Sequence, residues 1–263
     1  MSSEEAVAAA REFAFPLVLK STRSVRCTAG RVRQQRVQVA DEVRLLEAAI
    51  AAVGVPLTLQ EYVSDTAIVS CAAVRVDGQL LRLTHARYIR TYPAQRGSAA
   101  LATTIAPPRA LTERVEKLLS LIGWCDIFEL ELLERGEDQF NAIDFNPRPF
   151  GRLALAIGAG ANLPALSCDH VLRRRNVSLD RVHVGISYRW EDADVRNALV
   201  HLRRARLCSA AAVLRPHMRV VHAPFRIDDP APLVTRMLSM VQKASRGGIR
   251  GEAHARATGT SSS

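Results

Sequence analysis

The chain has 263 residues, of which 48% are hydrophobic and 24% are charged. A composition this close to the globular average excludes a wholly disordered chain and a fibrous repeat, and the length allows one large domain or two modest ones. No apolar run reaches the roughly 18 residues that a membrane span requires, and the first ten residues are acidic rather than basic, so we predict neither export nor a membrane partner.

The formal net charge is +10, and only three of the 36 basic residues are lysines. Arginine can grip phosphate through paired hydrogen bonds, but an excess of charge alone is weak support for a nucleic-acid partner. Aromatic side chains, on which bases stack, make up only 5% of the chain. We therefore predict no nucleic-acid partner, and an arginine-rich nucleic-acid binder is the weakest alternative function.

The five cysteines are widely separated and form no C-x-x-C pair. A scattered set of odd number predicts neither a disulfide framework nor a structural zinc site. The pattern favours a reducing compartment, so we predict a cytoplasmic protein.

The first part of the chain predicts a helix, a strand, a loop and a second helix. Ser3 can cap a helix over residues 3–13, whose first turn holds two glutamates. The apolar run 15–20 ends in a charge and predicts a strand. Residues 21–38 are polar and predict a loop, and apolar residues at helical spacing predict a helix over 39–53.

The middle of the chain predicts antiparallel strands. Residues 57–63 and 67–76 are strand-like, and the Asp-Gly pair at 77–78 is a strong two-residue hairpin signal before a strand over 80–85. Apolar residues at helical spacing then predict a helix over 111–122.

A second hairpin is predicted from strands over residues 127–133 and 139–146. Helices follow near residues 153–157 and 164–174. These elements predict an α+β fold, and we assign residues 1–175 to one domain.

The remaining sequence predicts a small C-terminal α/β subdomain over residues 176–244. Its predicted elements are a strand, a helix, an extended segment and a last helix, at residues 182–190, 195–206, 218–225 and 232–241. Residues 245–263 are mostly Gly, Arg, Ala, Ser and Thr, which predicts a disordered tail.

Acidic side chains gather on the second predicted hairpin. Alternate side chains of a strand share a face, so Asp144 shares a face with Asn146. For the same reason Glu129 shares a face with Glu131. Two registers bring both pairs to a common face, with either Glu129 or Glu131 opposite Asp144. Each register stacks like charges with no neutralising lysine, which favours a bound Mg²⁺.

A solvated acidic face is the alternative explanation of this pattern. The other face of the hairpin, however, is filled by apolar side chains, namely Phe128, Leu130, Leu132 and Phe145. The exit from the second strand, residues 146–151, contains two prolines and a glycine and is stiff enough to fix the position of Arg148. A site that holds magnesium and a phosphate therefore explains the pattern better.

Residues 144–148, Asp-Phe-Asn-Pro-Arg, resemble the acidic-x-Asn-Pro-Arg signature of the ATP-grasp superfamily, in its carbamoyl-phosphate-synthase-like and carboxylate-amine ligase branches. The resemblance implies that Asp144 and Asn146 bind Mg²⁺ or Mn²⁺. It also implies that Arg148 contacts phosphate and the reacting acyl group. Over roughly residues 3–174 it implies the ATP-grasp fold, antiparallel sheets flanked by helices.

The resemblance extends to further residues. Glu131 falls near the position of the other metal-binding carboxylate of the family, with Glu129 as the alternative. Lys20 is similar to the lysine that ends a strand and contacts the nucleotide phosphates, and Asp65 is a candidate for the ribose. The hinge that binds adenine in the family is similar to four residues of this chain, namely Gln60, Glu61, Tyr62 and Val63. The resemblance implies adenine contacts from the side chain of Glu61 and the backbone of Val63.

Two arginines resemble the basic strand and loop of the family that face the phosphates and the acceptor. These are Arg87 and Arg90, followed by the turn 92–97. The resemblance implies nucleotide binding for Arg87. It implies a catalytic role for Arg90, together with Lys20 and Arg148.

The chain departs from the family in two ways. Family members carry an N-terminal α/β domain before the strand that here ends in Lys20, so we expect an N-terminally incomplete ATP-grasp module. The loop that covers the phosphates is usually rich in glycine, whereas residues 21–36 contain only Gly30.

The resemblance implies an ATP-dependent ligase that joins a small-molecule carboxylate to an amine or a thiol through an acylphosphate. The alternative is a truncated, non-catalytic ATP-binding module that needs a partner chain or an upstream domain. We expect a homodimer, or a partner chain that supplies the missing domain, to complete such a module.

Overall fold

The computed structural model describes most of the chain, in the following ranges: residues 3–10, 12–23, 25–28, 31–34, 37–53, 56–64, 66–94, 97–136, 138–174, 181–223, 228–232, 234–236 and 238–239. Its contacts divide the chain into two units, Met1–Thr66 and Ala67–Ser263, and each is described by itself. Within the described ranges no helix has both the length and the apolar character needed to cross a membrane.

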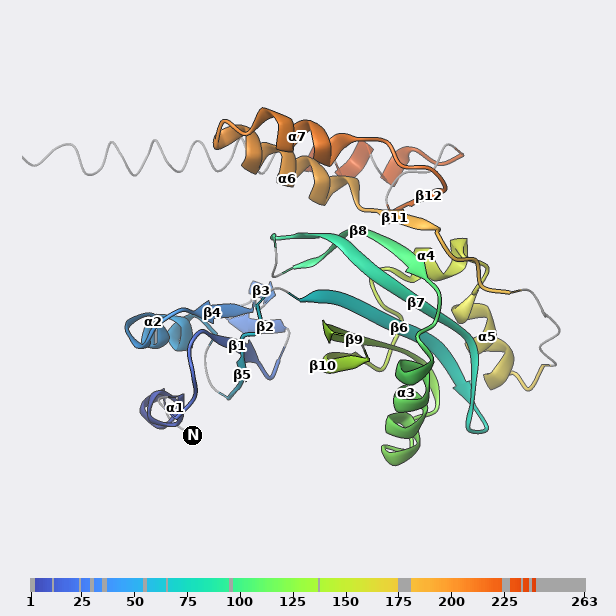
Figure 1. Ribbon diagram of the computed structural model, residues 1–263, viewed down its shortest axis with the longest axis horizontal. Coiled ribbons are helices and arrows are strands. Elements are labelled where there is room, and N and C mark those ends of the chain that lie inside the picture. The colour runs from blue at the N-terminus through green and yellow to red at the C-terminus, as the bar shows by residue number, and fades with distance from the viewer. Residues whose placement is uncertain are drawn as a thin grey trace, which may run out of the picture. The chain divides into compact units, whose positions relative to one another are not determined.

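The described residues of the first unit include two helices and a small antiparallel sheet (Figure 1). The helices are α1 (Ser3–Ala10) and α2 (Val43–Val53), and the sheet has the order β4 (Gln38–Ala40), β1 (Leu17–Ser21) and β5 (Leu57–Glu61). Alternation along β1 buries Leu17 and Leu19 in one cluster with Leu46 of α2. The predicted helix over 39–53 begins only at Val43, because β4 pairs with β1.

The segment predicted as a loop contains a two-stranded ladder. β2 (Val25–Thr28) pairs with β3 (Arg31–Gln34). Val25 and Val32 are 52% and 74% exposed. These two valines therefore lie outside the core, so the described side chains of the ladder give no buried-face periodicity from which strands are predicted.

In the described part of the second unit, seven strands form one sheet (Figure 1). Their spatial order is β10 (Gln139–Asn146), β9 (Asp126–Gly136), β6 (Ala67–Val76), β7 (Gln79–Tyr92), β8 (Ser98–Ile105), β11 (Ser187–Arg189) and β12 (Val220–His222). Neighbouring strands are antiparallel except for β11 and β12. With helices on its faces, this sheet gives the α+β class that the sequence predicts.

The predicted Asp-Gly hairpin joins β6 to β7. Asp77 and Gly78 have φ angles of +48° and +82°, the left-handed pair that a two-residue type I′ turn requires. β6 spans the predicted residues 67–76, whereas β7 continues past the predicted end at His85 to Tyr92. Its second half pairs with β8.

Helices cover both faces of this sheet (Figure 1). They are α3 (Arg109–Leu121), α4 (Leu153–Gly158) and α5 (Leu163–Val171). α3 packs on one face, against Phe128 and Leu130 of β9, and α4 and α5 pack on the other. Because alternate side chains of β9 point to opposite faces, Glu129 and Glu131 lie on the α4 side.

The C-terminal part of the second unit adds two strands and a helical hairpin to the same sheet. β11 pairs with β8 and β12, and α6 (Glu191–Arg203) lies beside α7 (Leu207–Leu214) (Figure 1). The sequence predicts one helix over 195–206, but the chain turns at Ala205, which has a φ of +54°. The strand predicted over 182–190 is shorter, since only β11 pairs.

Two predicted domain limits fall outside the described residues. The boundary after residue 175 lies among residues 175–180, and the tail 245–263 lies beyond the last described position. The contacts divide the chain after Thr66, and β11 and β12 share a sheet with β6 to β10.

Candidate functional site

The predicted acidic side chains form a cluster on the α4 side of the sheet. We call Glu129, Glu131, Asp144 and Asn146 the acid cluster. β9 and β10 pair Glu131 with Asp144, and Glu129 with Asn146. Of the two registers that the sequence allows, the structure therefore contains the one with Glu131 opposite Asp144.

A β-bulge in β10 brings Asp144 to this face. Before the bulge Ala142 pairs with Leu132. If that register continued, Asp144 would lie opposite Leu130, which packs under α3. The pairing shifts between Ala142 and Asp144, so one extra residue in β10 reverses the alternation and turns the carboxylate toward the glutamates.

A buried arginine neutralises the two glutamates. Arg152 is only 6% exposed, and its Nη2 donates to Oε1 of Glu129 and, at 2.8 Å, to Oε1 of Glu131. Its guanidinium lies 4.2 Å from the ring centroid of Tyr88, whose hydroxyl donates to Oε1 of Glu131 at 2.6 Å. Burial lowers the pKa of Arg152 to about 10, so the guanidinium is charged at neutral pH.

The sequence pattern did not single out Arg152, although two signals for it exist. Stacked carboxylates without a lysine require some other cation, and Arg152 is the next basic residue after Arg148. The pocket beside its guanidinium is also lined by small side chains of β6 and β7, namely Ser70, Ala72, Thr84 and Ala86. Small residues on neighbouring strands leave room for a long side chain from another element.

Burial dominates the electrostatics of Glu129, which is 2% exposed. Burial raises the pKa of this carboxyl well above its ordinary value, and the charges of Glu131 and Asp144 raise the pKa further. The hydrogen bond from Asn146 and the charge of Arg148 lower it. An added cation near Glu129 would therefore stabilise the ionised carboxylate.

The side of the acid cluster away from Arg152 offers oxygen donors. Asn146 Nδ2 donates to Oε2 of Glu129 and to Oδ2 of Asp144, both at 3.4 Å. Asp144 is exposed and Asn146 is half-buried. The amide presents its oxygen to the same point when its orientation is reversed. Two carboxylates and one amide can therefore meet a single ligand there.

This donor set fits a small divalent cation. Mg²⁺ is usually held by one or two carboxylates together with water and substrate phosphates, rather than by a complete protein cage. Among the residues that the structure describes, no three carboxylate, thiol or imidazole groups converge as a preformed metal site. Glu129, Asp144 and Asn146 match the open kind of site, and Arg148 is exposed just beyond them.

No family model and no curated protein matches the sequence. Solved structures do match it. One is biotin carboxylase from Campylobacter jejuni in its βγ-ATP complex, with a TM-score of 0.52 and 16% identity, over 71% of this chain and 43% of that chain. Another is carboxyaminoimidazole ribonucleotide synthase from Aspergillus clavatus complexed with ATP, with a TM-score of 0.52 and 12% identity, over 71% and 48% of the two chains.

The chain has the ATP-grasp fold. The fold expected from the resemblance is therefore confirmed. At these identities the likeness shows the fold alone. The chain spans less than half the length of each of the two neighbours.

Except for Arg87, the nucleotide contacts that the resemblance implies lie in the first unit. Lys20 of β1 pairs with Thr58 of β5, which is two residues from Gln60. Paired residues and alternate residues share a face, so Lys20 and Gln60 lie on the same face of this sheet. The buried Leu19 lies on the opposite face, so the structure brings these two predicted contacts together away from the core.

The other predicted hinge residues lie at the end of β5 and immediately after it. Glu61 ends β5, and the backbone N–H of Tyr62 donates to the carbonyl of Pro16 at 3.1 Å. Val63 is half-buried, and Asp65 lies outside the described residues. Their roles at adenine and ribose remain predictions.

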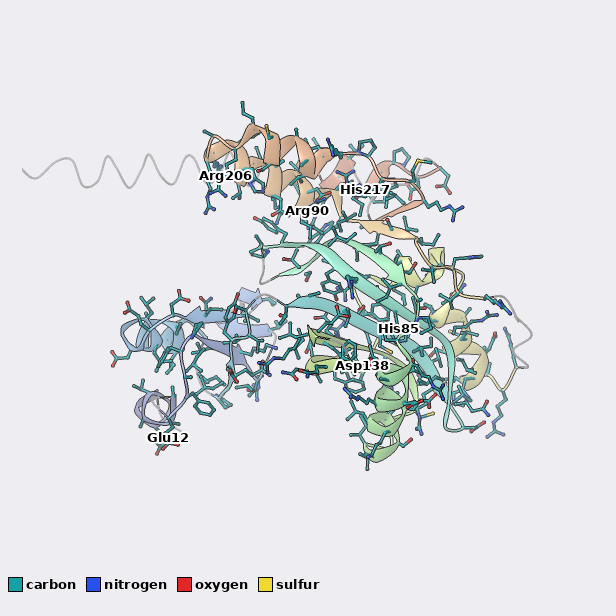
Figure 2. The ribbon with its side chains drawn as sticks, in the orientation of Figure 1. Glu12, His85, Arg90, Asp138, Arg206 and His217 are labelled. Atoms are coloured by element: carbon teal, nitrogen blue, oxygen red, sulfur yellow. The ribbon has the colours of Figure 1, made fainter. Side chains whose placement is uncertain are left out.

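Carboxylates outside the acid cluster engage the two predicted basic residues of β7. Arg87 pairs with Val69 on the α3 side of the sheet and donates to both carboxylate oxygens of Glu134. Arg90 donates to both carboxylate oxygens of Asp194, each at 2.8 Å, next to the α6–α7 hairpin (Figure 2). The structure does not bring either arginine to the acid cluster, and their roles at the phosphates and the acceptor remain predictions.

Proposed function

We propose that the chain is an ATP-dependent ligase that activates a small-molecule carboxylate as an acylphosphate, which an amine or a thiol then attacks. The observation that carries this proposal is the convergence of Glu129, Asp144 and Asn146 beside Arg148 in an ATP-grasp fold. The two neighbouring structures are complexes with ATP or βγ-ATP, which supports ATP as the nucleotide.

The proposed cation is Mg²⁺ or Mn²⁺, and its proposed ligands are Glu129, Asp144 and Asn146. The sequence gives Glu131 as the ligand, with Glu129 as the alternative. Oε1 of Glu131 accepts from both Arg152 and Tyr88, whereas Oε2 of Glu129 faces Asn146, which favours Glu129 as the ligand. When bound, the cation offsets negative charge on the phosphate oxygens.

The protein side chains act by positioning and by charge. Arg148 follows the strand on a stiff turn, and its guanidinium can hold a phosphate or acylphosphate through two parallel hydrogen bonds. Lys20 is proposed to contact the nucleotide phosphates, and residues 60–63 the adenine. The proposed reaction requires no covalent bond to the protein, because orientation and charge stabilisation lower the barrier.

A thermal-shift titration tests the proposal. ATP with Mg²⁺ is expected to stabilise the purified chain, by about 2.7 kcal/mol at a hundredfold excess over the dissociation constant. ATP with a chelator should give a smaller shift, and Asp144→Ala should lose the metal-dependent part. Glu113→Ala removes an exposed carboxylate on α3 and serves as the matched control. An equal metal-dependent shift in Asp144→Ala would contradict the assignment.

A second candidate is a non-catalytic ATP-binding module that needs a partner chain or a second copy of this chain. The observation that favours it is that Glu134 and Asp194 engage Arg87 and Arg90, the two arginines that the resemblance places at the phosphates and the acceptor. A panel of carboxylates with hydroxylamine as the nucleophile separates the two. The ligase forms ADP and a hydroxamate with one of the carboxylates, whereas the module binds ATP with Mg²⁺ and forms neither product.

A further inference from the structure

The carboxylate oxygens of the acid cluster divide between two sides. On one side, Arg152 Nη2 contacts Oε1 of both Glu129 and Glu131. On the other side, Asn146 Nδ2 contacts Oε2 of Glu129 and Oδ2 of Asp144. Glu129 therefore links the two sides, with one oxygen directed to each.

Arg152 is fixed on its side by packing. It is 6% exposed, its guanidinium stacks on Tyr88, and the hydroxyl of Tyr88 holds the same Glu131 oxygen that Arg152 contacts. Arg152 is also the residue directly before α4, so the start of a helix packed on the sheet sets its backbone position. The guanidinium is thus a preorganised positive charge between two carboxylates.

The charges of the cluster match one divalent cation. When ionised, the carboxylates of Glu129, Glu131 and Asp144 and the guanidinium of Arg152 leave a net charge of about −2, which the charge of nearby Arg148 reduces to about −1. One divalent cation offsets that charge, whereas a second would leave a large excess of positive charge beside the buried Arg152. We propose that Arg152 takes the place of a second metal ion, so that the chain holds a single divalent cation on the Asn146 side.

This inference rests on the proposed function and adds a positioning residue to it. Arg152 holds Oε1 of Glu129, which leaves Oε2 of the same carboxylate directed toward Asn146 and Asp144. The arginine acts through Glu129 and contacts neither cation nor substrate. Because both oxygens belong to one rigid carboxylate, the position of the Arg152 guanidinium also sets the direction in which Oε2 of Glu129 faces the cation.

The number of bound ions tests the inference without any catalytic assay. Mn²⁺ alone is titrated into the chain, and free Mn²⁺ is measured by its electron paramagnetic resonance signal. We expect one ion per chain in the wild type and two in Arg152→Met, which removes the charge and keeps an apolar stem. Arg152→Lys retains the charge and should bind one ion. Arg109→Met, on the exposed face of α3, should also bind one.

The outcomes separate this inference from the proposed function. Two ions in the wild type, or one ion in a folded Arg152→Met, would overturn the inference and leave the metal site in place. No bound ion in the wild type would overturn the metal site and the inference together.

A double variant identifies the source of the second ion. In Arg152→Met with Glu131→Gln, the carboxylate that Arg152 releases is neutral, so we expect a return to one ion with wild-type affinity. A second ion in this variant, or no ion, would overturn the inference. If circular dichroism shows that Arg152→Met alone does not fold, Arg152→Gln removes the charge while it keeps hydrogen-bond donors, and it should bind two ions; one ion in a folded Arg152→Gln would overturn the inference.

Discussion

His85 makes the stability of the second unit depend on pH in a direction that the structure determines. The side chain lies on β7, is 2% exposed, and neither ring nitrogen has a hydrogen-bond partner among the residues that the structure describes. Burial lowers its pKa from the ordinary value of 6.5 to about 4, because a buried imidazole is not solvated when it takes up a proton.

The pKa difference sets the size of the effect. Between pH 6.5 and about 4 the unfolded chain binds a proton at His85 that the folded chain does not bind. The contribution of His85 to stability is therefore fully present above pH 6.5 and is lost as the pH falls through this window. At 1.36 kcal/mol for each pH unit, the loss amounts to about 3 kcal/mol below pH 4 and to about 2.5 kcal/mol at pH 4.5.

Urea unfolding of the wild type and of His85→Leu measures this contribution. The difference between the two free energies of unfolding cancels the groups that they share, including Glu129, whose raised pKa acts in the opposite direction. We expect His85→Leu to gain about 2.5 kcal/mol on the wild type between pH 7 and pH 4.5. Parallel stability curves over that range would refute the burial argument.

Three further predictions concern stability. Asp194→Asn should cost about 3–5 kcal/mol in urea unfolding, because Asp194 is 1% exposed and accepts from both Arg90 and Arg189; a cost no larger than that of Glu113→Gln would contradict it. Phe128→Ala should cost about 3–5 kcal/mol by the same measurement, since Phe128 is fully buried, and a cost near zero would show that the site is not packed as described. Gly97→Ala should lower the melting temperature, because a Cβ there would lie 1.9 Å from a backbone carbonyl oxygen, and an unchanged melting temperature would disprove that close approach.

The sequence predicted those elements that have one buried face. In α3, Leu111, Val115 and Leu119 are buried at the helical spacing from which the helix was predicted. In β9, apolar residues on the α3 side alternate with acidic residues on the α4 side, so the pattern again reflects what each face contacts. The valines of the β2–β3 ladder are exposed, so its described side chains give no buried-face periodicity, and the sequence predicts a loop there.

The acid cluster could be predicted only up to a choice between two registers. Alternation within a strand fixes which residues share a face, but it does not fix which residues lie opposite each other. The β-bulge left a trace, because the apolar residues of β10 change from even positions, Phe140 and Ala142, to odd positions, Ile143 and Phe145. That change of parity marks one extra residue in the strand.

Arg152 lies beyond local pattern altogether. It occupies a turn, where neither strand nor helix periodicity constrains a side chain, and it reaches carboxylates more than 20 positions earlier in the sequence. Only the neighbouring strands, which supply small side chains and two carboxylates, determine that an arginine fits there. Such a residue follows from the packed structure rather than from its own segment.

β11 is only three residues long, yet it protects the chain from self-association. It pairs with Leu101, Ala102 and Thr103 along the outer edge of β8, a strand whose side chains are largely buried. In a chain truncated after residue 174, this edge would present unpaired backbone donors and acceptors beside small apolar side chains. Open edges of this kind add strands from other molecules and lead to aggregation. By pairing with β8, β11 therefore blocks the addition of a strand from a second molecule at this edge.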